Sequence, residues 1–275
     1  MHRLLYKEIV AAAIAEDLGT GDRTTESIFA QETGEAEIIA REEGLVAGLP
    51  VAKEVFAQVD ERIRFAACLC DGDRLRPGDR LALLQGPVCG ILTGERVALN
   101  FLQRLSGVAT ATSRAVESVR GTGARIVDTR KTTPGLRVLE KYAVRTGGGG
   151  NHRFNLSDMI LIKDNHIRCA GSIAEAVARV RRYCSFSAKI EVEAANLQDV
   201  QEALASGVEI IMLDNMTTEM MREAVRMIDG RALVEASGGI TPERIREVAA
   251  TGADLISLGY LTHSTCSLDL SLKSI

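Results

Sequence analysis

The sequence predicts an α/β protein with two parts: an N-terminal α/β domain over residues 1–110 and a parallel α/β barrel over residues 111–275. Two observations support this. In the second half, short apolar runs of β-forming residues recur, the later ones about 20–23 residues apart with helical segments between them. This spacing suits a tight β/α repeat whose parallel sheet closes into a barrel. In the first half, strand-like runs instead follow one another across turn signals.

The first half is expected to begin and end with a helix. Lys7, Glu8 and Glu16 interrupt an apolar stretch at helical spacing, so residues 4–16 predict an amphipathic helix rather than a signal peptide. A long helix is expected to begin with Thr93 as its N-cap and to join the two halves. Between these helices, strands are expected at residues 35–40, 44–48, 62–70 and 80–85.

The second half carries six apolar runs that predict the barrel strands. A helix is expected at residues 172–183, and Thr241-Pro242 and Gly252 are the start and stop signals of another. In a parallel barrel the carboxyl ends of all strands point to one mouth, so residues that follow the runs should lie close together. The runs lie at residues 124–128, 159–164, 188–194, 209–214, 232–239 and 254–260.

The composition excludes several classes of protein. Hydrophobic residues make up 46% and charged residues 25%, as in ordinary globular chains. Trp is absent and the pI is near 5.7, which argues against nucleic-acid binding. No apolar run reaches the roughly 18–20 residues that span a bilayer. The six cysteines show no CxxC and no zinc-site spacing, so reduced thiols and a cytoplasmic location are expected.

Charged and glycine-rich residues follow or interrupt the apolar runs. The alternative explanation is that strands simply end in polar residues by chance. That explanation does not account well for charged residues inside the runs or directly after them. Residues 125–168 carry a net charge of +5 in a chain of net charge −4. A local basic centre in an acidic protein indicates a small polyanionic ligand, with a solvated basic face as the alternative. The cations near the expected strand ends are Arg130, Lys131, Arg153 and Lys163.

Two histidines lie near these strand ends. His152 follows the glycine run at residues 147–150, whose backbone N–H groups can bind anions, so His152 is expected to contact an anion. His166 belongs either to the site or to a cap of the next segment.

Polar groups at the later strand ends suggest two further ligands. Ser237, Gly238 and Gly239 precede a helix start and resemble a phosphate cup that Gly259 would complete. Glu193 and Asp214 can hold ribose hydroxyls or Mg²⁺, and structural ion pairs with Lys163 are the alternative.

The centre of the chain resembles the signature of the quinolinate phosphoribosyltransferases, also called nicotinate-nucleotide pyrophosphorylases (carboxylating). It reads DTRKTTPGLRVLEKYAVRTGGGGNHRFNLSDMILIKDNHI at residues 128–167. Further stretches resemble the family in the same order, so the resemblance covers most of the chain. They are EDLGTGDRTT (16–25), GERVALNFLQRLSGVAT (94–110), EVEAANL (191–197), IIMLDNM (210–216), EASGGIT (235–241) and ISLGYLTHS (256–264).

This resemblance implies an open α/β sandwich domain followed by a barrel with an incomplete strand count. The final segment could return to the sandwich. It implies a homodimer, with a hexamer left open, in which the sandwich of one subunit covers the barrel mouth of the other. The implied reaction joins quinolinate to phosphoribosyl pyrophosphate with Mg²⁺. The products are nicotinate mononucleotide, pyrophosphate and CO₂, in de novo NAD synthesis.

The resemblance also implies a role for each site residue. Arg130, His152, Arg153 and Lys163 would surround the quinolinate carboxylates, and Arg96 would reach in from the other subunit. Lys131 and Lys163 would face the pyrophosphate and phosphoribosyl oxygens. Glu193 and Asp214 would bind the ribose hydroxyls and the metal region. The 5′-phosphate would be bound by Ser237, Gly238, Gly239 and Gly259.

Three other functions stay open. A paralogue would keep the fold and the donor site but use another acceptor. A non-catalytic protein would bind a phosphorylated metabolite without turnover. A phosphate-binding aldolase or isomerase would need a Schiff-base lysine, which Lys163 beside Asp164 could imitate.

Overall fold

The computed structural model describes residues 1–274, which form two compact units. The N-terminal unit combines Met1–Ser113, Thr132–Gly148 and the chain from Leu261 onward, and the barrel unit combines Arg114–Lys131 and Gly149–Tyr260. The expected domain boundary at residue 110 lies inside α4 (Val88–Ser118), a helix that contributes residues to both units.

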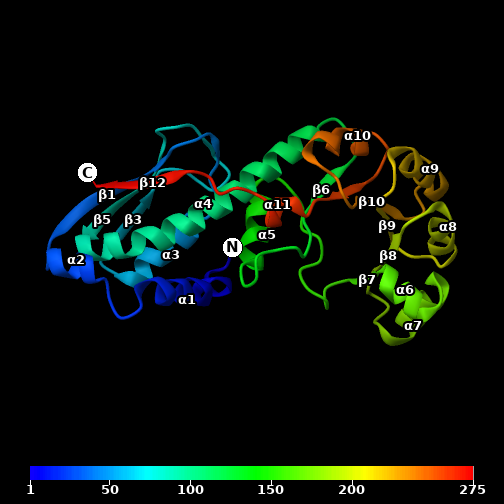
Figure 1. Cartoon of the computed structure of the whole chain (residues 1–275), viewed down its shortest axis with the longest axis horizontal. Coiled ribbons are helices and arrows are strands. Elements are labelled where there is room, and N and C mark those ends of the chain that lie inside the picture. The colour runs from blue at the N-terminus through cyan, green and yellow to red at the C-terminus, as the bar shows by residue number, and fades with distance from the viewer. Residues whose placement is uncertain (275) are drawn as a thin grey trace. The chain divides into compact units, whose positions relative to one another are not determined.

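The N-terminal unit is built on an antiparallel sheet with the strand order β12-β1-β5-β3. Helices α3 and α4 pack against one face of this sheet and bury the apolar core of the unit (Figure 1). The last strand of the chain pairs with the first strand of the sheet. The strands are β1 (Thr33–Ala40), β3 (Arg64–Ala67), β5 (Arg80–Pro87) and β12 (Leu270–Ser274), with β2 (Gly44–Leu45) and β4 (Arg74–Leu75) forming a separate pair.

Short helices complete the N-terminal unit, and the expected first helix is confirmed as α1. The strand-like pattern at residues 44–48 ends early, because α3 begins directly after Gly48. The helices are η1 (Arg3–Leu5), α1 (Lys7–Leu18), α2 (Arg23–Ile28), α3 (Leu49–Val59), α5 (Arg137–Thr146) and α11 (Tyr260–His263), the last beginning at the end of the barrel unit.

Thr93 is not the N-cap of the long helix, so that prediction was wrong. Helix α4 begins at Val88, directly after β5, and Thr93 lies within its second turn. The Thr93 hydroxyl donates instead to Asp22 Oδ2 at 3.2 Å. Thr93, a residue type common at helix N-caps, therefore links two segments of the N-terminal unit instead.

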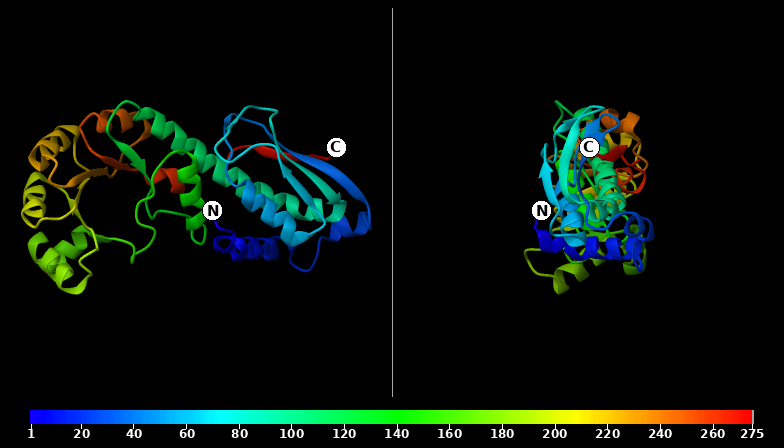
Figure 2. Two further views of the ribbon diagram at one scale, coloured as in Figure 1. Left: turned by 180° about the vertical axis from the view of Figure 1, so that it is seen from behind. Right: turned by 90° about the vertical axis from the view of Figure 1, so that its left-hand side faces the viewer.

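The barrel unit confirms the parallel α/β architecture. Its six strands form one parallel sheet in the order β6-β11-β10-β9-β8-β7, and each strand falls within one of the six apolar runs. Helices lie outside the strands (Figures 1 and 2). The strands are β6 (Arg125–Val127), β7 (Ile160–Ile162), β8 (Ile190–Ala194), β9 (Ile210–Asp214), β10 (Leu233–Ser237) and β11 (Leu255–Ser257).

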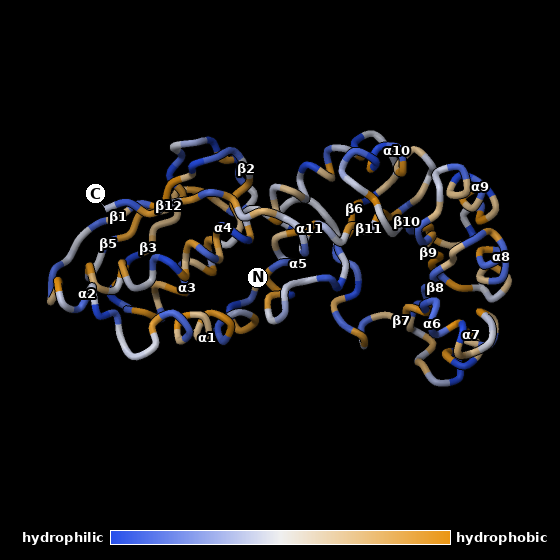
Figure 3. The backbone as a smooth tube through the Cα atoms, in the orientation of Figure 1, coloured by the Kyte–Doolittle hydropathy of each residue, from blue (hydrophilic) through white to orange (hydrophobic). Residues whose placement is uncertain are grey.

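The helices of the barrel unit follow the strands as expected. Ser172 caps α7, and the Thr241-Pro242 signal is confirmed by a 3₁₀ turn that leads into α10. Strands β8 and β9 are hydrophobic over most of their length (Figure 3), as expected for strands covered on their outer face. The helices are α6 (Asp164–Ala170), α7 (Ile173–Tyr183), α8 (Leu197–Ala205), α9 (Thr218–Ile228), η2 (Pro242–Arg244) and α10 (Ile245–Ala249).

Strands β6 and β7 are the two ends of the sheet order, so the ring of strands is open between them. Gly150 forms an isolated parallel bridge with Val127 of β6, and its N–H donates to Ile126 O at 2.8 Å. A Cβ at Gly150 would lie 3.2 Å from Val127 Cγ1, which favours glycine at this close approach. The segment that carries His152 therefore starts at the open edge of the barrel.

Every helix in residues 1–274 is too short or too polar to cross a membrane.

Candidate functional site

A cavity of about 450 Å³ lies within the barrel unit at the carboxyl ends of the strands. Ten of the residues predicted for the site line it, and they come from the ends of five strands and from the segment before β7. They are Arg130, Lys131, His152, Arg153, Lys163, Glu193, Asp214, Ser237, Gly238 and Gly239. Convergence of the strand ends on one mouth, as expected for a parallel barrel, explains this gathering.

Two predicted residues do not line this cavity. Arg96 lies on α4 in the N-terminal unit, where it lines a separate pocket with Asp22 and Thr93. Gly259 follows β11 and lies two residues beyond Ser257, which does line the cavity.

Lys163 stands at the junction of β7 and α6. Its Nζ forms an ion pair with Glu193, as the alternative reading of the carboxylates expected. Its backbone N–H donates to His166 Nδ1 at 2.9 Å, so His166 caps α6. Of the two roles left open for His166, the structure therefore shows the helix cap.

Glu193 and Asp214 reach the cavity from neighbouring strands. Glu193 pairs in register with Met212 on β9, so Asp214 lies one inward-facing position nearer the mouth. Asp214 Oδ2 accepts from Asn215 Nδ2 at 3.0 Å. Two carboxylates facing a cavity with a Ser-Gly-Gly turn fit Mg²⁺, which is usually held by one or two carboxylates with phosphates and waters.

The Ser237-Gly238-Gly239 turn requires its glycines. Gly238 has φ +86°, and a Cβ there would lie 2.4 Å from Asn215 Oδ1. Ser257 Oγ donates to Ser237 Oγ at 2.9 Å, which ties the end of β11 to the turn. Successive backbone N–H groups in such a turn form a concave anion site.

The segment after the glycine run is held by a buried aspartate. Asp128 is fully buried, accepts from Asn151 Nδ2 at 2.6 Å and accepts from His152 N–H at 2.8 Å. Arg153 Nη1 donates to Met159 O at 3.2 Å. Burial lowers the pKa of Arg153, and the neighbouring Arg130 lowers it further, while Glu191 and Glu193 oppose both effects. Arg130 and Arg153 line the same cavity, and guanidinium groups are well suited to bind an anionic ligand there.

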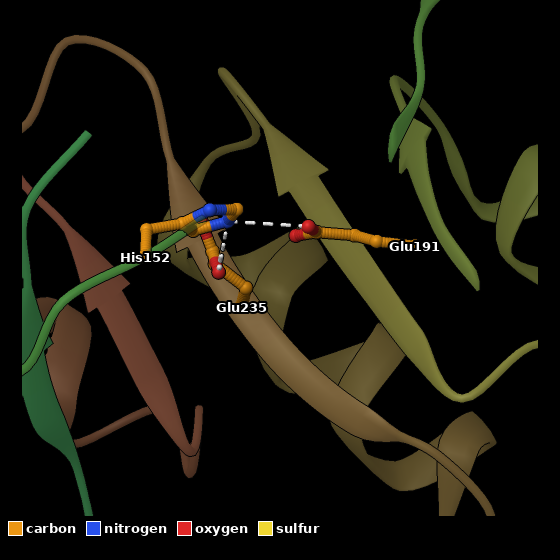
Figure 4. Close-up of side chains that lie close together, drawn as sticks. All are labelled: His152, Glu191 and Glu235. Carbon is orange, nitrogen blue, oxygen red and sulfur yellow. Dashed lines mark ion pairs between the residues drawn. The ribbon is translucent and has the colours of Figure 1, made fainter. Parts of the chain in front are cut away.

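Sequence reasoning assigned no role to Glu191 and Glu235, which meet His152 inside the barrel (Figure 4). Burial raises the pKa of Glu191, and His152 opposes that effect. Burial lowers the pKa of His152, but Glu191 and Glu235 outweigh it, so the net direction is upward. A signal for both glutamates was present, because each lies two residues before a predicted site residue on the same strand and so on the same face.

The comparisons with known proteins agree across the whole chain. Residues 22–106 match the family model "Quinolinate phosphoribosyl transferase, N-terminal domain", and residues 108–273 match the corresponding C-terminal domain. The chain is 47% identical over 272 residues to the probable nicotinate-nucleotide pyrophosphorylase (carboxylating) of Bacillus subtilis, covering 99% of this chain and 94% of the relative.

Two further relatives extend this likeness. A quinolinate phosphoribosyltransferase (decarboxylating) of Nicotiana glauca is 39% identical, covering 97% of this chain and 81% of the relative. The crystal structure of NadC from Streptococcus pyogenes matches with a TM-score of 0.96 at 44% identity, covering 100% of this chain and 99% of that chain.

Proposed function

The chain belongs to the quinolinate phosphoribosyl transferase family, and on that basis we propose that it joins quinolinate to phosphoribosyl pyrophosphate with decarboxylation. The products are nicotinate mononucleotide, pyrophosphate and CO₂, a step of de novo NAD synthesis. One observation carries this proposal: a single cavity combines four cations, three carboxylates and a Ser-Gly-Gly turn. That set matches the two anionic substrates.

The acceptor half of the cavity holds the pyridine dicarboxylate. Arg130 and Arg153 offer planar guanidinium groups that bind carboxylates through paired hydrogen bonds, and Lys163 adds a point charge. His152 lies beside Arg153 in the wall of the same cavity. An acceptor with only one carboxylate would leave a cation of the cavity without its carboxylate partner, which favours quinolinate over nicotinate.

The donor half holds phosphoribosyl pyrophosphate. The turn at Ser237, Gly238 and Gly239, completed by Gly259, binds the 5′-phosphate through backbone N–H groups. Glu193 and Asp214 bind the ribose hydroxyls. Lys131, with Lys163, faces the pyrophosphate oxygens.

Mg²⁺ belongs to this proposal as the cofactor of the donor. Glu193 and Asp214 would hold it, directly or through water, together with oxygens of the substrate. When bound, it supplies positive charge that stabilises the leaving pyrophosphate.

The chemistry needs no nucleophile from the protein. The pyridine nitrogen attacks the anomeric carbon as the bond to pyrophosphate breaks, and positive charge builds on the ribose. Lys131 stabilises the leaving oxygens, and the carboxylates of Glu193 and Asp214 stabilise the cationic ribose. Decarboxylation follows, because the quaternised ring can accept the electron pair released at C2.

The assembly and the compartment are also part of the proposal. Arg96 would complete the site of a second subunit in a homodimer, or in a hexamer of such dimers. Mixing Arg96→Ala and Lys131→Ala subunits would then restore about a quarter of wild-type activity, because half of the random dimers carry one intact site of two. The six cysteines are free, which supports a cytoplasmic location.

A direct assay tests the function. The purified protein is incubated with Mg²⁺, phosphoribosyl pyrophosphate and either quinolinate or nicotinate, and mononucleotide and CO₂ are followed. Product with stoichiometric CO₂ from quinolinate alone is expected. Product from nicotinate without CO₂ would overturn the acceptor assignment, and ligand binding without any turnover would favour the non-catalytic protein.

A further inference from the structure

Two glutamates that the proposed reaction does not use meet one histidine inside the barrel unit. Glu191 on β8 and Glu235 on β10 have side chains that are 0% and 1% exposed. Their carboxylates lie 3.1 and 3.3 Å from His152 Nε2 (Figure 4). Buried carboxylates are costly unless they are paired, so this arrangement requires an explanation.

His152 is the contact that these carboxylates share. Within residues 1–274, the carboxylates interact with each other, and their four oxygens have no N–H donor besides His152 Nε2. A cluster built for stability would satisfy more of these oxygens, since unsatisfied buried acceptors destabilise the fold. The sparse contacts therefore favour a role in the site above them.

The ring of His152 links the glutamates to Arg153. His152 Nδ1 accepts from the Arg153 backbone N–H at 2.8 Å, so a ring proton stays on Nε2 and faces the carboxylates. On the other side, the His152 backbone N–H donates to Asp128. The position of the ring thus sets the backbone of Arg153, whose guanidinium lines the cavity.

A metal ion is the alternative occupant of this cluster. One ligand atom from each of His152, Glu191 and Glu235 lies within 4.8 Å of the others, which is compatible with a shared ion. A metal, however, needs the lone pair of Nε2, and metal-bound histidines usually donate a hydrogen bond from their other nitrogen. Here the other nitrogen accepts one, so the geometry favours an Nε2–H donor.

We propose that Glu191 and Glu235 are positioning residues that hold the Nε2–H of His152 and thereby aim Arg153 at the acceptor carboxylates. This inference rests on the proposed function for the identity of the acceptor. Glu191 lies two residues before Glu193 on the same face of β8. Glu235 on β10 and Glu193 on β8 both pair in register with Met212 of β9, the strand between them. Glu235 lines the cavity itself, and the pair reaches the acceptor side through His152, whose neighbour is Arg153.

Steady-state kinetics of Glu191→Gln, Glu235→Gln and the double variant test the proposal. We expect KM for quinolinate to rise about tenfold or more, while KM for phosphoribosyl pyrophosphate changes less than about twofold. Glu209→Gln is the matched control, because Glu209 caps the Ile190 N–H at the amino end of β8, away from the cavity. Unchanged kinetics, or equal rises in both KM values, would overturn the proposal.

¹⁵N-histidine NMR tests the ring independently of activity. The chain has four histidines, and His152→Asn identifies the signal of His152. We expect Nε2 of wild-type His152 to carry a proton, and we expect the Nε2 signal to shift in the double glutamine variant. One tightly bound metal per chain with an unprotonated Nε2 would overturn the inference. An inactive wild type with the expected ring pattern would instead count against the proposed function.

Discussion

Both units contain buried carboxylates, but the number of hydrogen-bond donors around these carboxylates differs. In the N-terminal unit, Glu140 is fully buried and accepts from Arg104 Nε at 3.0 Å and Nη2 at 2.7 Å. It also accepts from Thr133 N–H at 3.0 Å and from the Thr133 hydroxyl at 2.8 Å. In the barrel unit, Glu191 and Glu235 share one imidazole nitrogen.

This difference separates a structural charge from a functional one. Arg104 also donates to the backbone oxygens of Thr262 and Thr265, so the Glu140 network joins three segments of the N-terminal unit. Every strong acceptor there has a donor, which is the condition under which a buried ion pair is stable. Glu191 and Glu235 lack such a full set of donors, and their role is to fix the geometry of the cavity.

The largest expected effect is on stability, at Glu140. Glu140→Ala leaves Arg104 without its buried partner, and we expect a loss of about 3–5 kcal/mol in the free energy of unfolding, measured by urea denaturation. Glu117→Ala is the control, because Glu117 is 61% exposed and pairs with the exposed Arg120. A loss at Glu140 no larger than at Glu117 would contradict the comparison.

The next effect is on activity, within the barrel unit. Arg130→Ala should mainly weaken quinolinate binding, because it removes one of two guanidinium groups in the acceptor half. Asp214→Ala should mainly lower kcat with the phosphoribosyl donor. We expect losses of about 10²-fold or more in kcat/KM for each, from steady-state kinetics in both substrates. Small and equal losses from both would refute this division of the site.

The barrel was predictable because its signals are local. Each of the six strands is a short apolar run in one stretch of sequence, and β/α spacing fixes the parallel order of such runs. Helices α3 and α5 were missed because neither N-cap residue makes a side-chain cap. For α3 the cap comes from Asp71, which accepts from Gly48 and Leu49 N–H groups. An acceptor 22 residues away leaves no local signal.

The site was predictable to the same extent. Residues at strand ends could be named, because the mouth of a parallel barrel collects them wherever each strand ends. The partners beneath them could not, since the contact between His152 and Glu235 depends on how β10 lies across the barrel from the open edge. The roles of the residues, the Mg²⁺ and the homodimer stay predictions that the experiments above address.

A smaller effect is expected at Gly238. Gly238→Ala adds a Cβ that collides with Asn215, the residue that holds Asp214, and forces a side chain into positive φ. We expect KM for phosphoribosyl pyrophosphate to rise about tenfold. Gly230→Ala is the matched control, because Gly230 has φ +72° with nothing within 4 Å of the added Cβ. A KM for phosphoribosyl pyrophosphate that is as low in Gly238→Ala as in Gly230→Ala would contradict this prediction.

The smallest effect concerns Glu54, a buried carboxylate of the N-terminal unit whose main partner is exposed. Glu54 Oε2 accepts from Arg3 Nε at 2.5 Å, and Gln58 also donates to the carboxylate at 2.8 Å. The hydrogen bond from Arg3 holds the pKa of Glu54 below its usual range, against the effect of burial.

Because the pKa of Glu54 is lower in the folded state than in the unfolded one, its contribution to stability is present above the unfolded value of about 4.3. It is lost as the pH falls through the folded value. Arg3→Ala should therefore lower the urea midpoint slightly at pH 7, and the difference from wild type should disappear at low pH. A difference that persists in acid would assign the effect to packing of the Arg3 side chain instead of its ion pair with Glu54.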